Sequence, residues 1–294
     1  MMFDLYERKT MKYSNIILLS DLDGTLFNAQ SEVSEENKKA IEHFVANGGR
    51  FGVATGRARD NSLRLLTGVP INYYSIFLNG ALLHDGVSGE NVGLEFLEKE
   101  KLVPLIKKCL EKYPTIGILI YLEKDTYFVS PKELSPAQLV KEGKLEGEFV
   151  NLEGIMDEEW MKLFFHGEQE ELRMLEEDAK ALIEEGVVDG IYTHAHYFEL
   201  LPKDCSKGKM VGRIHQLKND KDLIYAVGDF YNDVEMIAVA DVGIYTANAP
   251  EELKEGANRT TVDCNQHAIA DVIERIIEED LTSGLGEKKV KVMQ

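Results

Sequence analysis

The chain has 294 residues, of which 44% are hydrophobic, enough for one large domain or two ordinary ones with buried cores. Its 52 acidic and 33 basic residues give a formal net charge of −19, which repels a nucleic-acid backbone and an anionic membrane surface alike. No stretch has the apolar length of a membrane span, and the first ten residues lack an apolar signal core. The composition therefore predicts a cytoplasmic protein without a nucleic-acid or membrane partner, and it leaves the oligomeric state open.

The first part of the chain alternates between strand and helix patterns. A buried strand is predicted at residues 16–19, because a continuous apolar run is typical of a strand covered on both faces of a parallel sheet. A helix beginning at Ser34 follows, and further strands are predicted at 51–54 and 75–78, with a helical stretch at 61–66 between them. This order predicts an α/β fold with a doubly wound parallel sheet.

The pattern changes between about residues 83 and 201. Two helical patterns alternate there with runs rich in β-forming residues: helices at 101–113 and 170–185, and strands at 116–122, 126–130, 162–166, 187–193 and 197–201. We therefore expect an inserted α+β cap domain at 84–201, within a catalytic core formed by residues 13–83 and 202–280.

The core pattern then resumes and continues to the last helix. Helices are predicted at 207–217 and 233–239, strands at 223–227 and 242–245, and a final helix from the spacing of Ile269, Val272, Ile273 and Ile276. Met11 precedes the first strand at the distance expected of an initiator methionine, so residues 1–12 are predicted to be an N-terminal extension, with a misassigned start before Met11 as the alternative. Residues 281–294 are predicted to form a flexible tail.

Two carboxylates follow the first predicted strand. Asp21 and Asp23 are separated by one apolar residue and are followed by Gly24 and Thr25. This spacing would let one carboxylate attack phosphorus while the other transfers protons. The five-residue motif alone also fits a chance match or a cation-binding turn.

Four motifs in one order narrow these interpretations. They are Asp-Leu-Asp-Gly-Thr-Leu at 21–26, Val-Ala-Thr-Gly-Arg at 53–57, Ser-Lys-Gly at 206–208 and Gly-Asp-Phe-Tyr-Asn-Asp at 228–233. In this order they resemble the haloacid dehalogenase (HAD) superfamily, in particular its Cof-type phosphatases with a C2B-like cap. The resemblance covers nearly the whole chain, and it implies a HAD-like Rossmannoid core with an inserted α+β cap.

The resemblance also implies roles for individual residues. Asp21 would be the nucleophile and Asp23 the general acid and then the base. A Mg²⁺ cofactor would be held by Asp21, the backbone carbonyl of Asp23 and Asp229, with Asp233 nearby. The carboxyl ends of strands, where these residues are predicted to lie, are where such sheets bind ligands.

Further candidates come from the second and third motifs and from two asparagines. Thr55 would hold a phosphoryl oxygen, and Lys207 would neutralise the nucleophile and the transferring group. Taken singly, Thr55 also fits a helix cap and Lys207 a solvated lysine of a first helical turn. The candidate substrate contacts are Gly56, Arg57, Asn79 and Asn232, and Arg57 also fits a structural pairing with one of the many acids.

The implied function is Mg²⁺-dependent hydrolysis of phosphomonoesters of small metabolites through an aspartyl-phosphate. Sugar phosphates, pyridoxal phosphate and flavin mononucleotide all remain open as substrates. A phosphosugar mutase-like phosphoryl transferase shares the core motifs and stays an alternative. A noncatalytic phosphate or metal sensor is disfavoured because Asp21 and Asp23 are both present. Haloacid dehalogenation is disfavoured as well, because dehalogenases lack the acid that corresponds to Asp23.

The insert predicts a two-lobed molecule with a pocket between the lobes. We expect its floor to be Asp21, Asp23, Thr55, Lys207 and Asp229, and its roof to include His194, His196 and the turn at 123–125. A zinc site built from His194, His196 and Cys205 is disfavoured, because the sequence suggests no fourth ligand. The three cysteines, Cys109, Cys205 and Cys264, are expected to be reduced thiols.

Overall fold

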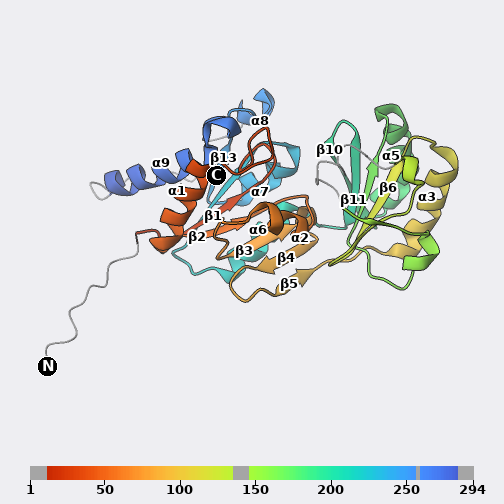
Figure 1. Ribbon diagram of the computed structural model, residues 1–294, viewed down its shortest axis with the longest axis horizontal. Coiled ribbons are helices and arrows are strands. Elements are labelled where there is room, and N and C mark those ends of the chain that lie inside the picture. Colours follow the sequence, from red (N-terminus) through yellow and green to blue (C-terminus); the bar gives the residue numbers. More distant parts are fainter. Residues whose placement is uncertain (1–11, 135–145, 256–258, 284–294) are drawn as a thin grey trace.

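The structure is a computed structural model that describes residues 12–134, 146–255 and 259–283. Its helices and strands form two lobes, which Figure 1 shows side by side. One lobe contains both the first and the last part of the chain, and we call it the core. The other contains the middle of the chain, and we call it the cap.

The centre of the core is a parallel sheet with the strand order β13-β12-β1-β2. Its strands are β1 (Ile16–Ser20), β2 (Arg50–Val53), β12 (Leu223–Gly228) and β13 (Val242–Tyr245). Leu18 packs into the hydrophobic cluster on one face of the sheet, and its neighbour Leu19 packs into the cluster on the other face. Because both faces are covered, every residue of β1 is buried, which explains the continuous apolar run.

Helices cover both faces of this sheet. On one side are α1 (Glu35–Ala46) and α9 (Ala268–Ser283), and on the other are α6 (Lys207–Leu217) and α7 (Val234–Val239). The first helix begins where the sequence predicted, because the hydroxyl of the N-cap residue Ser34 accepts a hydrogen bond from the N–H of Asn37 at 3.2 Å. The doubly wound α/β fold is therefore confirmed.

An antiparallel hairpin extends the core beyond β2. Strand β3 (Tyr74–Phe77) lies parallel to the end of β2 through a bridge between Ala54 and Ile76. Strands β4 (Leu82–Asp85) and β5 (Asn91–Leu94) then pair antiparallel in the order β3-β4-β5. Because β4 and β5 belong to the same sheet as β3, we propose that the inserted domain begins after Leu94, later than residue 84.

The cap is built on a six-stranded sheet with the order β10-β11-β9-β6-β7-β8, in which only β7 and β8 pair parallel. The strands are β6 (Gly117–Tyr121), β7 (Thr126–Phe128), β8 (Glu148–Phe149), β9 (Lys162–His166), β10 (Val188–His194) and β11 (Tyr197–Pro202). Helices α3 (Lys99–Lys112) and α5 (Gln169–Glu184) pack on one face of this sheet. The other face, including Leu119, Tyr121 and Phe164, packs in one cluster with core residues. The cap sheet is thus an inserted α+β layer that lies against the core.

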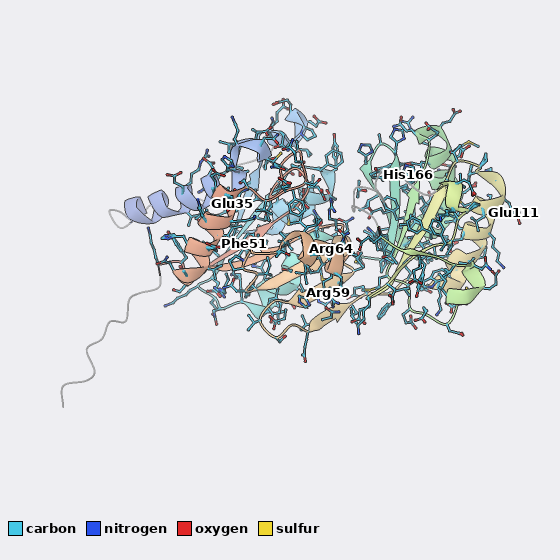
Figure 2. The ribbon with its side chains drawn as sticks, in the orientation of Figure 1. Glu35, Phe51, Arg59, Arg64, Glu111 and His166 are labelled. Carbon is cyan, nitrogen blue, oxygen red and sulfur yellow. The ribbon has the colours of Figure 1, made fainter. Side chains whose placement is uncertain are left out.

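Helix α2 (Arg59–Leu65) joins the two lobes at the surface. Figure 2 shows Arg59 and Arg64 on the side of the core that faces the cap. The guanidinium of Arg64 lies 2.6 Å from the carboxylate of Glu146, which comes from the cap. Both side chains are about half exposed, so this pair adds little stability. The buried contacts between the cap sheet and the core are the ones that hold the lobes together.

Two predicted terminal segments lie largely outside the described residues. Of the extension predicted at 1–12 only residue 12 is described, and of the tail predicted at 281–294 only residues up to Ser283, which belong to α9. Among the described residues the remaining α-helix is α8 (Glu251–Glu255), which is short. None of the helices in the described ranges has both the length and the apolar composition needed to cross a bilayer.

Candidate active site

The parallel strands end in polar residues at one edge of the core sheet. Asp21 directly follows β1, Asp229 follows β12, and Thr55 lies two residues beyond β2. The N–H of Asp21 bonds to the carbonyl of Val227 at 2.9 Å, which places the ends of β1 and β12 side by side. The sheet topology thereby gathers residues that are far apart in the sequence, as predicted for an open α/β sheet.

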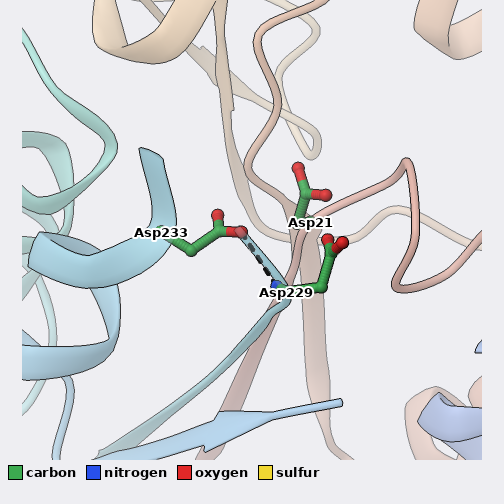
Figure 3. Close-up of side chains that lie close together, drawn as sticks. All are labelled: Asp21, Asp229 and Asp233. Carbon is green, nitrogen blue, oxygen red and sulfur yellow. Dashed lines mark hydrogen bonds between the residues drawn. The ribbon is translucent and has the colours of Figure 1, made fainter. Parts of the chain in front are cut away.

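Three of these side chains form an acidic cluster. Carboxylate oxygens of Asp21, Asp229 and Asp233 lie within 4.8 Å of one another, and Figure 3 shows them converging. Asp233 is held by the backbone, since its Oδ2 accepts from the N–H groups of Asp229 at 3.0 Å and Phe230 at 3.1 Å. This contact is the dashed line in Figure 3 between Asp229 and Asp233. The cluster is therefore built from three hard oxygen donors: Asp21 and Asp229 at the ends of the adjacent strands β1 and β12, and Asp233 in the short 3-10 helix (Tyr231–Asp233) that follows β12.

Lys207 lies within the cluster. It is the first residue of α6, whose N-cap is Ser206. The Ser206 hydroxyl accepts a hydrogen bond from the N–H of Lys209 at 3.0 Å. The Lys207 ammonium donates to Asp21 Oδ1 at 2.6 Å and to Asp233 Oδ1 at 2.7 Å, and it is fully buried. Burial alone would lower the pKa of Lys207, but the two carboxylates raise it above its usual value. Lys207 is therefore a buried cation and not a solvated lysine.

One ammonium does not balance three carboxylates. Burial raises the pKa of Asp21 well above its usual value; Lys207 opposes this shift, while the charges of Asp233 and Asp229 add to it. Burial and the charge of Asp233 raise the pKa of Asp229 to about 7, although a hydrogen bond from the Thr25 hydroxyl at 3.0 Å acts in the opposite direction. A divalent cation would remove this repulsion, and carboxylate oxygens are the donors that Mg²⁺ prefers. The residues present thus fit the metal that the resemblance implies.

Asp23 lies apart from the cluster. Its side chain is 52% exposed, and the guanidinium of Arg57 donates to both of its oxygens, from Nε to Oδ2 at 2.6 Å and from Nη2 to Oδ1 at 2.6 Å. Arg57 also lies over the ring of Phe27, with 5.7 Å between its central carbon and the ring centroid. The structure shows Arg57 paired with an acid, and because Arg57 also lines the cavity described below, this pairing does not exclude contact with a substrate.

Thr55 shapes the loop after β2. Its hydroxyl accepts from the N–H of Arg57 at 3.2 Å, while helix α2 begins later, with Ala58 at the N-cap. Thr55 is therefore not the cap of α2. Gly56 packs against Asn79, since an added Cβ would lie 2.9 Å from the Asn79 amide nitrogen. A larger residue at position 56 would therefore have to displace the Asn79 amide.

The two candidate asparagines contact each other. Asn232 donates from Nδ2 to Asn79 Oδ1 at 3.1 Å. Asn79 itself has a left-handed backbone (φ 54°), is buried, and donates from Nδ2 to Glu199 of the cap at 2.8 Å. Asn232 lines the cavity described next, whereas Asn79 lies behind it and connects the core to the cap.

A cavity of about 720 Å³ lies between core and cap. Four of the five expected floor residues line it, namely Asp21, Asp23, Thr55 and Asp229, and the fifth, Lys207, is buried beneath Asp21. The expected roof is partly right, because His194, Lys124 and Asp125 line the cavity, whereas His196 and Glu123 do not. Cap residues that the sequence analysis missed also line it, among them Tyr121, Lys162, Phe164, Tyr197 and Glu199. Two of them, Lys162 and Glu199, could have been found from the sequence, because a charged residue in an otherwise apolar strand indicates a buried functional or paired group.

The histidines and cysteines form no comparable metal site. Within the described parts of the chain, Asp21, Asp229 and Asp233 are the group of three whose ligand atoms come close enough together. The rings of His194 and His196 have centroids 5.7 Å apart, and Cys205 is a buried free thiol, as are Cys109 and Cys264. Zinc at this place therefore has no support from the geometry.

Comparison with known proteins assigns the family. Residues 18–273 match the family model of haloacid dehalogenase-like hydrolases. The chain belongs to this family. A solved structure titled as a HAD subclass IIB sugar phosphatase, BT4131, superimposes with a TM-score of 0.75 at 19% identity, over 88% of this chain and 98% of that one. The family model confirms the predicted HAD superfamily, so the chain is a HAD-type hydrolase, and the solved structure shows the same fold.

Several curated relatives align with most of this chain. Phosphatase YwpJ of Bacillus subtilis is 25% identical over 89% of this chain and 99% of its own length. A second B. subtilis relative, 5-amino-6-(5-phospho-D-ribitylamino)uracil phosphatase YwtE, is 26% identical over 87% of this chain and 96% of its own length. The chain spans only 46% of the chloroplastic endoribonuclease YBEY of Arabidopsis thaliana, to which it is 27% identical. The similarity to this larger protein therefore concerns about half of it.

Proposed function

We propose that this HAD-like hydrolase is a Mg²⁺-dependent phosphatase that hydrolyses phosphomonoesters of small metabolites through an aspartyl-phosphate on Asp21. The observation that carries the proposal is the cluster of Asp21, Asp229 and Asp233 around Lys207, at the bottom of a cavity shared by core and cap. A buried carboxylate next to an ammonium and a potential cation site has the surroundings that a nucleophile attacking a phosphate dianion requires.

The first chemical step breaks the ester bond. A carboxylate oxygen of Asp21 forms a bond to phosphorus while the ester oxygen leaves, and Asp23 gives its proton to that oxygen. The alcohol departs, and the phosphoryl group remains on Asp21. Lys207 stabilises the ionised form of the nucleophile, because its ammonium lies 2.6 Å from Asp21 Oδ1.

The second step regenerates the enzyme. Asp23, now ionised, takes a proton from water, whose oxygen attacks the phosphorus of the aspartyl-phosphate, so that inorganic phosphate is released and Asp21 returns to its carboxylate form. Mg²⁺, held by Asp21, the backbone carbonyl of Asp23 and Asp229 with Asp233 nearby, would neutralise charge on the phosphoryl oxygens when bound. Thr55 and the loop of Gly56 and Arg57 border the same cavity and are the proposed contacts of the phosphoryl group, together with Asn232.

The cavity also bears on the substrate class. It is closed on one side by the cap, so it suits a small phosphorylated molecule better than a folded phosphoprotein. Sugar phosphates or similar metabolites are the proposed substrates, since the subclass IIB neighbour is titled a sugar phosphatase and the relative YwtE is named for a phosphorylated ribityl compound. The aromatic rings of Tyr121, Phe164 and Tyr197 would pack against the carbon skeleton of such a substrate.

A panel of phosphorylated metabolites, assayed with and without Mg²⁺ for release of inorganic phosphate, tests the proposal. We expect hydrolysis that EDTA abolishes, and no turnover by Asp21→Asn, whose amide has nearly the same shape but cannot attack phosphorus. Mass spectrometry after rapid acid quenching should find one phosphoryl group on wild-type Asp21 and none in the variant. Activity retained by Asp21→Asn would exclude the covalent mechanism, and transfer to a second sugar without phosphate release would identify a mutase.

A further inference from the structure

An ion pair is buried in the cap where it faces the core. Lys162 begins β9, and Glu199 lies in β11, the neighbouring strand. Their side chains are 2% and 4% exposed, and Lys162 Nζ lies 3.1 Å from Glu199 Oε2. Because removing two charges from water costs more than their attraction returns, such a pair persists only where further hydrogen bonds satisfy both groups.

Those further bonds come from both lobes. Within the cap, the Thr193 hydroxyl donates to Glu199 Oε1 at 3.0 Å, and Lys162 Nζ lies 4.5 Å from the centre of the Tyr121 ring. From the core, the carbonyl of Gly56 accepts from Lys162 Nζ at 2.7 Å, and Asn79 donates to Glu199 Oε2 at 2.8 Å. The ion pair is therefore fully satisfied only while the cap lies against the core.

The two core partners belong to loops that carry proposed site residues. Gly56 stands between Thr55 and Arg57, and Arg57 holds the carboxylate of Asp23. Asn79 accepts from Asn232, and its own N–H donates to the carbonyl of Thr55 at 3.0 Å. The cap ion pair thus contacts two loops that are hydrogen-bonded to each other and that border the acidic cluster.

We propose that Lys162 and Glu199 form a latch: when the cap closes, they bind the Gly56 carbonyl and the Asn79 amide and thereby fix the loops that position Arg57, Asp23 and Asn232. They are positioning residues, since they act through Gly56 and Asn79. The effect on turnover rests on the proposed function, but the effect on the loops does not. An ion pair that served only to stabilise the cap would not need partners from the core.

The test replaces both charges together, because a single replacement would leave one buried charge unpaired. In Lys162→Met with Glu199→Leu, we expect thermal unfolding close to that of the wild type. Hydrogen exchange of the Leu78 and Asn79 amides, which donate to the carbonyls of Arg57 and Thr55, should become about tenfold faster, as expected when one supporting hydrogen bond is lost. Turnover of p-nitrophenyl phosphate should fall by about tenfold for the same reason.

The charge-swapped variant, Lys162→Glu with Glu199→Lys, separates the latch from cap stability. It keeps an ion pair inside the cap but places a carboxylate against the Gly56 carbonyl. Both groups are hydrogen-bond acceptors, so no hydrogen bond can form between them. We expect amide exchange at Leu78 and Asn79 to be as fast, and turnover to be as low, as in the apolar variant. If the apolar variant does not fold, Lys162→Met with Glu199→Gln replaces it, since glutamine still accepts from Thr193.

Asp178→Asn is the matched control, because Asp178 pairs with Lys108 and Lys112 inside the cap and is not part of the contacts with Gly56 and Asn79. It should leave amide exchange at Leu78 and Asn79 unchanged. Unchanged exchange in the apolar variant, or recovery in the charge-swapped one, would overturn the latch. If the wild type has no phosphatase activity but the apolar variant still shows faster exchange, the proposed function is contradicted and the latch is supported.

Discussion

Arg57 donates to both carboxylate oxygens of Asp23, each at 2.6 Å. A forked pair of this kind fixes the plane of the carboxylate as well as its position, and a lysine cannot reproduce it. Arg57 thus sets the direction in which the proposed acid presents its proton.

We expect Arg57→Lys to lower kcat by about ten- to a hundredfold, with the larger loss on alkyl phosphates, whose poor leaving groups need the proton most. Steady-state assays that compare an alkyl phosphate with p-nitrophenyl phosphate measure this difference. Arg213→Lys is the control, because Arg213 pairs with Glu95 away from the cavity. Equal losses on both substrates would show that Arg57 does not orient the acid.

Asp229→Asn should change metal-free stability and Mg²⁺ response in opposite directions. The pKa of Asp229 is raised to about 7, so above that pH the folded metal-free protein holds a carboxylate that burial and Asp233 disfavour. At pH 8 the neutral amide should therefore raise the metal-free Tm, while the Mg²⁺-induced increase in Tm should disappear. Thermal scans with EDTA and with Mg²⁺ measure both effects. Asp60→Asn, which changes a cavity carboxylate outside the cluster, should alter neither.

Gly24 keeps the first motif clear of Asp229. Its backbone is left-handed (φ 77°), and an added Cβ would lie 2.3 Å from Asp229 Oδ2. We expect Gly24→Ala to lower the free energy of unfolding by about 2 kcal/mol or more and to raise the Mg²⁺ concentration needed for activity. Gly89→Ala separates the two causes, because Gly89 is equally left-handed (φ 76°) but has open space around it. It should cost about 1 kcal/mol and leave the Mg²⁺ requirement unchanged.

Asp178 should make the cap sensitive to acid. Burial alone would raise the pKa of Asp178, but the hydroxyl of Tyr113 and the ammonium groups of Lys108 and Lys112 lower it to about 2. A folded-state pKa below the unfolded value of about 3.9 stabilises the protein above pH 4, and this contribution is lost as the pH falls toward 2. Urea unfolding of the wild type and Asp178→Asn should show a stability difference at pH 5 that shrinks toward pH 2.5. A constant difference across this range would mean that the carboxylate charge is not what stabilises the cap.

The sequence predicted most of the core because its signals are local. Asp21 and Asp229 follow apolar runs long enough for one strand each, and Ser206 marks the beginning of the helix that carries Lys207. The predicted boundary at residue 84 falls inside β4, and the sequence analysis predicted no strand at 82–85 or 91–94, because these strands are only four residues long. The contacts of Lys162 and Glu199 could not be predicted from the sequence, because the two residues meet only through strand pairing. Their core partners, a backbone carbonyl and a side-chain amide, have no sequence signature.

Three cations at the cavity are already matched to carboxylates: Arg57 to Asp23, Lys162 to Glu199 and Lys207 to Asp21. Lys124 also lines the cavity, and the proposed Mg²⁺ would add positive charge at its floor. Apart from these two, an arriving phosphate ester meets the repulsive field of a chain of net charge −19 and not an attractive funnel. Encounter with a dianionic substrate should accelerate as added salt screens that field, the reverse of the behaviour of electrostatically steered enzymes. The paired charges thus make ionic strength itself a determinant of how fast the enzyme captures its substrate.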